Sequence, residues 1–460
     1  MNILDNINGY PLDKYQRKAV LCKKENVLVV AGAGSGKTLT IIGKIRYLIE
    51  ELKINKEDIL CISFTNDTVN SLKESLLKNY NYDIDVYTFH KLSLEIIRNN
   101  NKDISICESD LLAYIVDEFF YRNIKIRDKE IYLRLKNLII TFINLFKSNN
   151  YNLGKFDEIF NNLKYSNEYI LLKIIKEIYI EYQEELNSTY KVDFNDMINE
   201  GINILKNKGY IKPYKYIIID EYQDTSFTKY NLIKEIKKIT NAKLFVVGDD
   251  FQSIYRFTGC NLDIFIKFKK YYKNSKILKI KNTYRNSQEL INIAGSFIMK
   301  NKNQIKKKLL SNKRIDKPIR IIYTTNIKST FKKLINKIDT DILVLGRNNS
   351  DMYKVMDSQT DKVKFLTVHK SKGLEEENVI IINLEDNILG FPSKIENHKI
   401  LKYVLNEKDM YPYEEERRLF YVALTRTKNY VYLIVDKNNQ SIFVKEIIKN
   451  NRKNIYFCEF

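Results

Sequence analysis

A glycine-rich loop between a short apolar segment and an amphipathic segment is the feature that most constrains the fold of this chain. The segment Val27–Val30 runs directly into Ala31-Gly32-Ala33-Gly34-Ser35-Gly36-Lys37-Thr38, and a helical pattern, Leu39–Ile49, follows. Glycines let the backbone wrap a phosphate chain with its N–H groups pointing inward, and the next helix adds the positive end of its dipole. Lys37 can then reach the β- and γ-phosphates while Thr38 holds Mg²⁺. This order predicts an α/β domain that binds a nucleoside triphosphate.

Two further apolar segments end in acidic turns and extend the predicted nucleotide site. Tyr216–Ile219 runs into Asp220 and Glu221, and Leu244–Val247 runs into a polar turn that contains Gln252. Adjacent carboxylates at the end of a strand can hold a metal with one group and water with the other. We predict that Asp220 binds Mg²⁺, that Glu221 orients or deprotonates the attacking water, and that Gln252 senses the γ-phosphate. A solvated acidic turn is the alternative for the first pair.

Continuous apolar runs recur in two sets, which predicts two parallel sheets. Such runs are typical of strands buried on both faces, and amphipathic stretches lie between them, as an α/β fold requires. The predicted strands are Val27–Val30, Ile59–Phe64, Tyr216–Ile219 and Leu244–Val247, then Ile342–Leu345, Lys364–Val368, Val379–Ile382 and Tyr430–Val435. From about Lys91 to Tyr190 this pattern disappears. Helical periodicity there predicts an insertion with helices at Ser109–Tyr121, Lys129–Phe146 and Tyr169–Leu186.

The composition favours a cytoplasmic protein that meets polyanions. The formal net charge of +20 attracts nucleic acid, although solubility combined with a lysine-rich genomic bias explains the charge equally well. The first residues lack the charged and apolar regions of a signal peptide, and the longest apolar stretches are too short to span a bilayer. The five cysteines show no CxxC pairing. We therefore expect no membrane partner, no disulfide framework and no zinc or iron–sulfur site.

These motifs and several others resemble those of superfamily 1 DNA helicases of the UvrD/Rep type, in the family's order over nearly the whole chain. The additional segments are Leu12–Gln16, Phe64–Asn66, Thr88–His90, Asn282–Arg285, Thr367–Glu375 and Glu415–Arg426. The resemblance implies two RecA-like P-loop NTPase domains with parallel sheets and a helical insertion in the first. We expect residues 1–90 and 191–280 to form the first motor domain, 91–190 the insertion, and 281–460 the second motor domain.

The resemblance also assigns residues to the ATP site. Gln16 would read adenine, Tyr284 would stack on it, and Glu375 would add a nucleotide contact. Arg285 and Arg426 would reach the γ-phosphate from the second domain, where an arginine finger contributes about 10³–10⁵ in rate; a surface salt bridge with Glu414–Glu416 is the alternative. The implied cofactors are ATP and Mg²⁺. The residues expected to hold them are Gln16, Ala31, Gly32, Ala33, Gly34, Ser35, Gly36, Lys37, Thr38, Asp220, Tyr284 and Glu375. The implied catalytic residues are Lys37, Glu221, Gln252, Arg285 and Arg426.

Single-stranded DNA, with its junctions to duplex, is the partner that the resemblance implies. Aromatic platforms and a basic groove suit such a strand, because stacking contributes roughly 1–3 kcal/mol per base. The expected contacts are Phe64, Thr65, Thr88, His90, Tyr255, Phe257 and His369, although each aromatic residue can instead belong to the core. The segment Asn301–Arg320 has eight Lys or Arg against one Asp. It either follows a nucleic-acid backbone or is a solvated loop.

Two departures from the family pattern affect the expected grip on DNA. After Tyr255 the family usually has Gly-Trp-Arg-Gly, whereas this chain reads Arg256-Phe257-Thr258-Gly259. Phe257 keeps a stacking face, but Thr258 replaces a charged contact. Relatives also insert a large subdomain before the Thr367–Glu375 motif. Here we expect only a loop near residues 348–363, because so short a segment cannot fold as a domain.

The sequence leads to one main hypothesis and two alternatives. The main hypothesis is an ATP-dependent DNA helicase or translocase that moves 3′ to 5′ on single-stranded DNA in repair, replication or defence. The first alternative is a translocase or ATP-switched subunit, which serves a nuclease, repair or defence partner without unwinding duplex alone. The second is a basic nucleic-acid-binding scaffold with a vestigial nucleotide site. RNA also stays open as the track, because the sequence offers no direct test of 2′-OH recognition.

Overall fold

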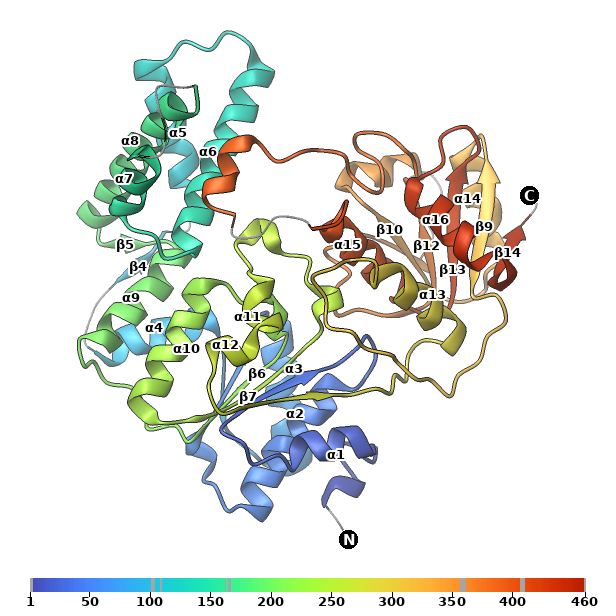
Figure 1. The fold of residues 1–460 in the computed structure, drawn as a ribbon, viewed down its shortest axis with the longest axis horizontal. Coiled ribbons are helices and arrows are strands. Elements are labelled where there is room, and N and C mark those ends of the chain that lie inside the picture. The colour runs from blue at the N-terminus through green and yellow to red at the C-terminus, as the bar shows by residue number, and fades with distance from the viewer. Residues whose placement is uncertain are drawn as a thin grey trace.

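The computed structural model describes residues 3–100, 104–107, 110–161, 163, 167–355, 361–405 and 410–458. It is an α/β fold with two six-stranded sheets, in which every strand pairs in parallel with its neighbours. A unit made only of helices and one short ribbon stands beside the sheets (Figure 1). No helix in these ranges combines the length and apolarity needed to cross a membrane. The predicted fold class is confirmed.

The first sheet has the strand order β3-β2-β6-β7-β1-β8. Alternate residues of β1 serve two layers: Val27 and Val29 pack with α2 and α3, whereas Leu28 and Val30 pack with α4, α9 and α10. Its strands are β1 Asn26–Val30, β2 Ile59–Ser63, β3 Asp85–Thr88, β6 Tyr216–Ile219, β7 Lys243–Gly248 and β8 Ser275–Lys279. Its helices are α1 Lys14–Val20, α2 Lys37–Arg46, α3 Asn66–Tyr80, α4 Phe89–Asn99, α9 Phe194–Lys206, α10 Phe227–Thr240, α11 Leu262–Ile266 and α12 Phe268–Tyr271.

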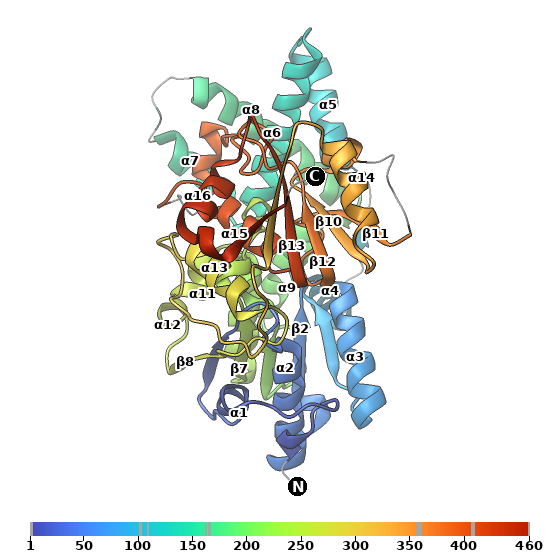
Figure 2. The same cartoon turned by 90° about the vertical axis from the view of Figure 1, so that its right-hand side faces the viewer.

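The second sheet has the order β11-β10-β12-β13-β9-β14. Val431 and Leu433 of β13 face a core shared with α13, α15 and α16, while Tyr432 and Ile434 face α14. The strands are β9 Ile319–Thr324, β10 Ile342–Gly346, β11 Val363–Thr367, β12 Glu376–Ile381, β13 Thr427–Asp436 and β14 Ile455–Cys458. The helices are α13 Gln288–Ile298, α14 Ile327–Asn336, α15 Glu414–Leu424 and α16 Ile442–Asn451. Figure 2 shows α14 on one side of this sheet.

Between β10 and β11, the described part of the expected loop near 348–363 includes the short helix Asn349–Lys354. Residues 356–360 of that expected loop lie outside the described residues.

The helical unit consists of α5 Leu111–Asn123, α6 Lys129–Ser148, α7 Leu153–Asn161 and α8 Asn167–Ser188. A two-stranded ribbon, β4 Ser105–Ile106 with β5 Lys191–Val192, lies where the chain leaves and rejoins the first sheet domain. The expected start of the insertion at residue 91 falls inside α4. Leu92 and Ile96 of α4 are buried in the core of the first sheet, because α4 covers that sheet with its apolar stripe. The change from strand to helix periodicity near residue 91 therefore lies within the first sheet domain and not at the start of the insertion.

A long excursion connects the second sheet to the helical unit. Residues 383–405, which we call the strap, follow β12. Leu384 and Phe391 are still buried in the core of the second domain, and the chain then crosses to the short helix Lys399–Tyr403 beside α6 (Figure 1). Ile400, Leu401 and Val404 are buried in the core of the helical unit. Burying such side chains contributes about 1.5–3 kcal/mol each, as an upper estimate. The C-terminal end of the strap is therefore packed on the helical unit.

The basic segment Asn301–Arg320 is neither a free loop nor wholly exposed. The Lys307 side chain is only 3% exposed and its Nζ pairs with Asp249 and Asp250, the latter at 2.7 Å. Leu309 is buried, and its side chain occupies the space that a Cβ at Gly32 would need. This segment closes the back of the glycine-rich loop.

We predict that Lys307→Met lowers the free energy of unfolding by about 3–5 kcal/mol, because it leaves two buried carboxylates without their cation. Thermal or urea unfolding followed by circular dichroism measures the change. Lys308→Met is the matched control, since Lys308 is exposed and should change little. Equal stability of the two variants would contradict the buried pairing.

Candidate nucleotide site and nucleic-acid groove

Three neighbouring strands of the first sheet position the predicted nucleotide-binding residues at one edge of that sheet. The glycine-rich loop follows β1, the turn with Gln252 follows β7, and Asp220 follows β6; these strands lie side by side. Carboxyl ends of parallel strands meet at one edge of a sheet, which is where ligands bind in such folds. The sequence order alone could not show this adjacency, because β6 and β7 come more than a hundred residues after β1.

The loop has the backbone that phosphate binding requires. Gly34 and Gly36 have φ of 66° and 73°, values that favour glycine. A Cβ at Gly34 would also lie 2.4 Å from Cβ of Arg285. Gly36 is the N-cap of α2 and offers no side-chain cap, so backbone N–H groups of the first turn are left for a ligand. The buried Oγ of Ser35 has no hydrogen-bond partner within the described part of the chain, which a bound phosphate would supply.

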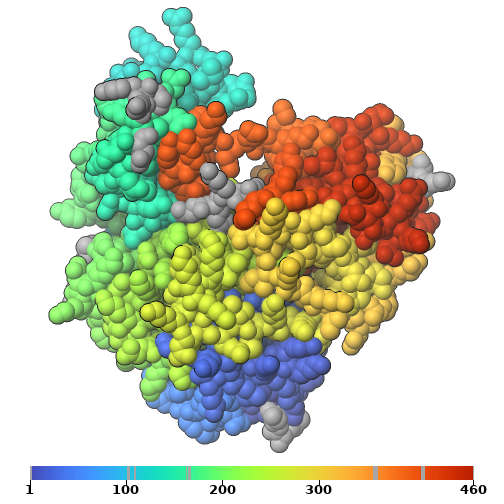
Figure 3. Space-filling view, viewed as in Figure 1, coloured from blue at the N-terminus to red at the C-terminus, as the bar shows by residue number. Residues whose placement is uncertain are grey.

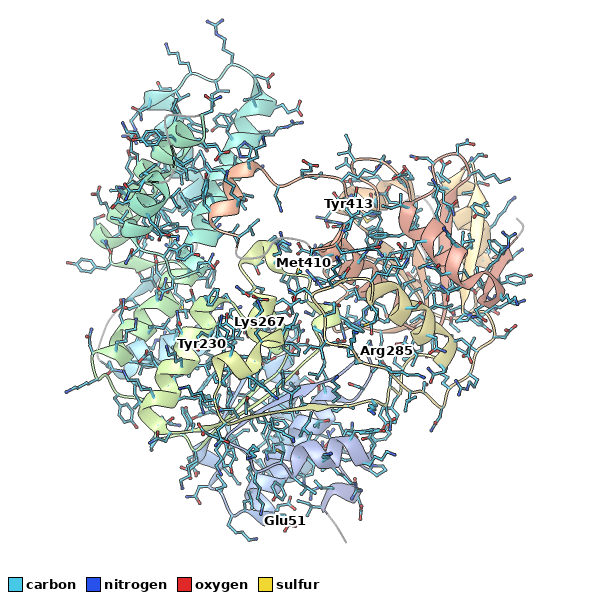
Figure 4. The ribbon with its side chains drawn as sticks, in the orientation of Figure 1. Glu51, Tyr230, Lys267, Arg285, Met410 and Tyr413 are labelled. Carbon is cyan, nitrogen blue, oxygen red and sulfur yellow. The ribbon has the colours of Figure 1, made fainter. Side chains whose placement is uncertain are left out.

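A cavity of about 400 Å³ brings most predicted nucleotide residues together. Both sheet domains contribute, and Figure 4 labels Arg285 where they meet. The predicted residues that line it are Gly34, Ser35, Gly36, Lys37, Thr38, Asp220, Glu221, Gln252, Tyr284, Arg285, Glu375 and Arg426. Ala31, Gly32, Ala33 and Gln16 do not line the cavity. Gln16 is buried behind the loop, where its Nε2 donates to Ser35 O at 3.1 Å and its Oε1 accepts from Asp13 N–H.

The two adjacent carboxyl groups have opposite pKa shifts. Burial, together with the neighbouring Glu221, raises the pKa of Asp220. Burial also acts on Glu221, but its ion pair with Lys37 and the charge of Lys372 hold its pKa below the ordinary value. A divalent cation near Asp220 would offset the repulsion between these carboxylates, and the Thr38 hydroxyl lines the same cavity. This donor set fits Mg²⁺ completed by phosphate oxygens and water.

Two arginines reach this cavity from the second domain. Nε of Arg285 donates to Oε2 of Glu375 at 2.5 Å. Arg426 is 1% exposed and donates to Oε1 of Gln252 at 3.0 Å. Burial and the neighbouring Arg285 lower the pKa of Arg426 to about 9. Neither arginine forms the surface salt bridge with Glu414–Glu416 that was the alternative; their side chains contact Glu375 and Gln252 instead.

The turn from Asp249 to Tyr255 belongs to both domains. It follows β7 of the first sheet, yet Phe251 and Ile254 are buried in the core of the second domain. The ring of Phe251 packs edge-on against Tyr421 of α15 at 5.3 Å. Packing therefore couples the position of Gln252 to the second domain.

Lys372, to which the sequence pattern assigns no role, lies between the predicted nucleotide residues and the expected DNA contacts. It lies inside the Thr367–Glu375 motif, and its Nζ pairs with Asp224 and donates to Gln252 O at 2.8 Å. The same Nζ lies 4.8 Å from the ring centre of Tyr255. One lysine of the second domain thus contacts the nucleotide turn and an expected DNA contact.

Three expected DNA contacts form one cluster at a groove. Tyr255 donates its hydroxyl to His369 O at 3.1 Å, and Phe257 meets the His369 ring edge-on at 5.5 Å. Phe257 is 56% exposed at the edge of a groove of about 1300 Å³, which Arg256, Arg347 and Lys370 also line. The Thr258 hydroxyl donates to Tyr255 O at 2.8 Å.

The other expected DNA contacts lie on the first domain, at the ends of β2 and β3. The ring of Phe64 packs edge-on against Phe89 at 5.3 Å, and Nζ of Lys229 lies 4.4 Å from its centre. His90 packs against Phe194. Thr65 and Thr88 accept backbone N–H groups as the caps of α3 and α4, so both have a structural role as well.

A glycine-rich loop facing two acidic turns and two arginines, on a pair of parallel sheets, defines a P-loop nucleotide hydrolase fold with two RecA-like domains. The UvrD/REP helicase N-terminal domain model matches residues 12–273, and the UvrD-like helicase C-terminal domain model matches residues 341–438. The chain belongs to the UvrD/Rep helicase family.

Relatives differ in how much of their length this chain covers. DNA helicase IV of Escherichia coli (strain K12) is 28% identical over 96% of this chain and 71% of its own length. ATP-dependent DNA helicase Rep of Buchnera aphidicola (strain APS) is 30% identical over 82% of this chain. A probable DNA helicase of Mycoplasma pneumoniae is 27% identical over 92% of this chain and 83% of its own length. The chain spans 63% of that Rep protein, less than two thirds.

We predict that protonation of histidine does not change the affinity for single-stranded DNA between about pH 6 and 8, although a free histidine titrates in this range. Burial with Lys229 nearby lowers the pKa of His90 to about 4, and burial with Arg347 and Lys372 lowers that of His369 to about 4. Both rings are therefore neutral above about pH 5 and gain a proton only below it. Fluorescence anisotropy of a labelled oligonucleotide in a His398→Gln background, which removes the exposed third histidine, measures this. Tighter binding on lowering the pH from 8 to 6 would contradict the assignment.

Proposed function

We propose that this chain is an ATP-dependent DNA helicase or translocase that moves 3′ to 5′ on single-stranded DNA and acts at junctions with duplex. The observation that carries the proposal is the cavity in which Arg285 and Arg426 of one sheet domain face Lys37, Asp220 and Glu221 of the other. Closure on a nucleotide then moves the two domains together, and hydrolysis releases them. Repair, replication or defence in the cytoplasm is the expected setting.

The proposed domain division follows the sequence expectation with one change. The first motor domain comprises residues 1–90 and 191–280 with α4 added, because α4 packs on the first sheet. The rest of 91–190 is the helical insertion, and 281–460 is the second motor domain. The strap of the second motor domain joins the insertion core.

The residues of the cavity have distinct proposed roles in phosphoryl transfer. Glu221 orients or deprotonates the attacking water, which requires Lys37 to leave Glu221 and turn to the phosphates. Arg285 and Arg426 stabilise charge that spreads over the γ-phosphoryl oxygens. Thr38 and Asp220 would hold Mg²⁺, which supplies charge neutralisation at the phosphates.

A short chain of contacts connects this cavity to the groove. Gln252 accepts from Arg426 through its side chain and from Lys372 through its carbonyl. Lys372 also faces Tyr255, whose hydroxyl bonds to the backbone of His369. A change at the γ-phosphate position can therefore move the aromatic cluster by direct contact.

A translocase or nuclease-partner subunit without stand-alone unwinding is the second candidate. Thr258, where the family has a charged residue, bonds to the Tyr255 carbonyl. A forked duplex with either tail polarity distinguishes the candidates, since a lone helicase must separate it. ATPase assays with single-stranded DNA, duplex DNA and RNA identify the track.

We predict that Lys37→Ala and Glu221→Gln abolish DNA-stimulated ATP hydrolysis while the chain still folds. Each removes a group needed in the transition state, and neither lies in an apolar core. Phosphate release measures turnover, and circular dichroism checks the fold. Normal turnover in either variant would overturn the site assignment, and no hydrolysis by the unchanged chain with DNA present would favour the scaffold alternative.

We predict that Phe64→Ala weakens single-strand binding by about 1–3 kcal/mol, the contribution of one stacked base, and slows basal hydrolysis less. Phe64 is half-buried at the end of β2, with Lys229 over its ring. Anisotropy titration and basal phosphate release measure the two effects. Unchanged affinity would place Phe64 in the core.

A further inference from the structure

The strap joins the second domain to the helical unit by both polar and apolar contacts. Glu168 of α8 accepts from Lys402 Nζ and from the Tyr403 hydroxyl, each at 2.8 Å. Nδ2 of Asn149, just after α6, donates to Val404 O at 2.7 Å. Together with the buried Ile400, Leu401 and Val404, these contacts fix one end of the strap on the helical unit.

The helical unit is also fixed to the first domain, and the first domain to the second. The Thr228 hydroxyl of α10 donates to Ser148 O at 2.7 Å, and Gly259 lies so close to Ser148 that a Cβ there would be 2.0 Å from its Oγ. Arg256 N–H donates to Oε1 of Glu415 in α15 at 3.2 Å. Helical unit, first domain, second domain and strap thus form a closed circuit of contacts.

The groove of about 1300 Å³ lies within this circuit. Its lining comes from the first domain at Phe257, from the second domain at Arg347 and His369, and from the strap at residues 393–397. Figure 3 shows an opening between the helical unit, the strap and the second domain, and Figure 4 labels Met410 beside it.

Exposed apolar side chains from more than one part of the chain line the groove, and they suit contact with unstacked bases. Phe257, Ile395 and Met410 line it and are 56%, 64% and 63% exposed. Such large apolar surfaces, next to the exposed Lys370, suit base faces and a phosphate backbone. The carboxylates of Glu396, Glu415 and Glu416 also line it. Arg347 neutralises Glu416 at 2.7 Å, and Oε1 of Glu415 accepts from Arg256 N–H.

We propose that the docked strap makes this groove a closed passage for one strand of nucleic acid, lined by Ile395 of the strap and by Phe257 of the first domain. This inference rests on the proposed function and adds a substrate class to it. A strand with a free end threads through the passage, whereas a strand without ends is admitted only when the strap leaves the helical unit.

Locking the strap tests the passage. Glu168→Cys and Lys402→Cys place two thiols at the docking contact, in a background where the partly exposed Cys22 and Cys458 are serine. A short bismaleimide joins them before DNA is added. ATP hydrolysis is then measured with a single-stranded DNA circle and with the same circle cut once. Each single-cysteine variant, treated with the same reagent, is the matched control.

The expected result is that the locked chain responds to the cut circle and loses its response to the intact one, while the controls respond to both. Cross-linking after loading should keep the chain on the intact circle through a salt increase that weakens ordinary binding by roughly 10³–10⁵. Equal stimulation of the locked chain by both DNAs, or loss of both responses, overturns the passage. If the chain without cross-link responds to neither DNA, the proposed function itself fails.

A second variant tests the role of the strap without a cross-linking reagent. Leu401→Asp places a charge in the apolar contact and should release the strap while leaving the nucleotide cavity intact. Dissociation from the intact circle should then become as fast as from the cut circle. Slow dissociation from the intact circle with the strap released would overturn the role of the strap.

Discussion

The turn from Asp249 to Tyr255 is the constraint on which the arrangement of the two domains depends. It is attached to the first sheet by the chain and to the second domain by packing, because Phe251 and Ile254 are buried in that core. Buried charges reinforce the attachment: Lys307 neutralises the acids behind the turn, while Lys372 and Arg426 bind Gln252 from the front. Separating the domains would leave several charges without partners, a cost of several kcal/mol for each. Relative motion must therefore exchange these contacts for others, and a bound phosphate offers such an exchange.

Much of the fold could be predicted from the sequence because its central strands are continuous apolar runs. Tyr216–Ile219 was predicted with its observed bounds, and the other predicted strands overlap observed ones. Six of the described strands were missed: β4 and β5 have only two residues each, β3, β8 and β14 lie at sheet edges, and β9 lies inside the second sheet, where Arg320 and Tyr323 interrupt its apolar run. Edge strands bury one face or less, so their composition resembles that of loops. The strap was missed because its helix has only one short apolar face.

The residues that line the cavity could be grouped from the sequence because each motif combines a strand end with a specific chemistry. The position of Gln16 was not predictable, since the same side chain serves both the cap of α1 and the glycine-rich loop. Thr65 and Thr88 show the limit for DNA contacts, because a threonine at the start of a helix is explained fully by capping. Lys307 shows the opposite case: a run of like charges concealed one buried cation among exposed ones. Burial is a tertiary property that the local charge pattern does not contain.

The length of the strap has a mechanical consequence. Residues 382–398 connect β12 to the docked helix without regular secondary structure. Leu384 and Phe391 are buried in the core of the second domain, and Ser393 N–H donates to Oε2 of Glu416 at 2.9 Å, so only residues 394–398 bridge to the docked helix. Fully extended, these five residues could reach on the order of 15–20 Å. The strap therefore limits how far the second domain can move from the helical unit while the docked helix stays in place.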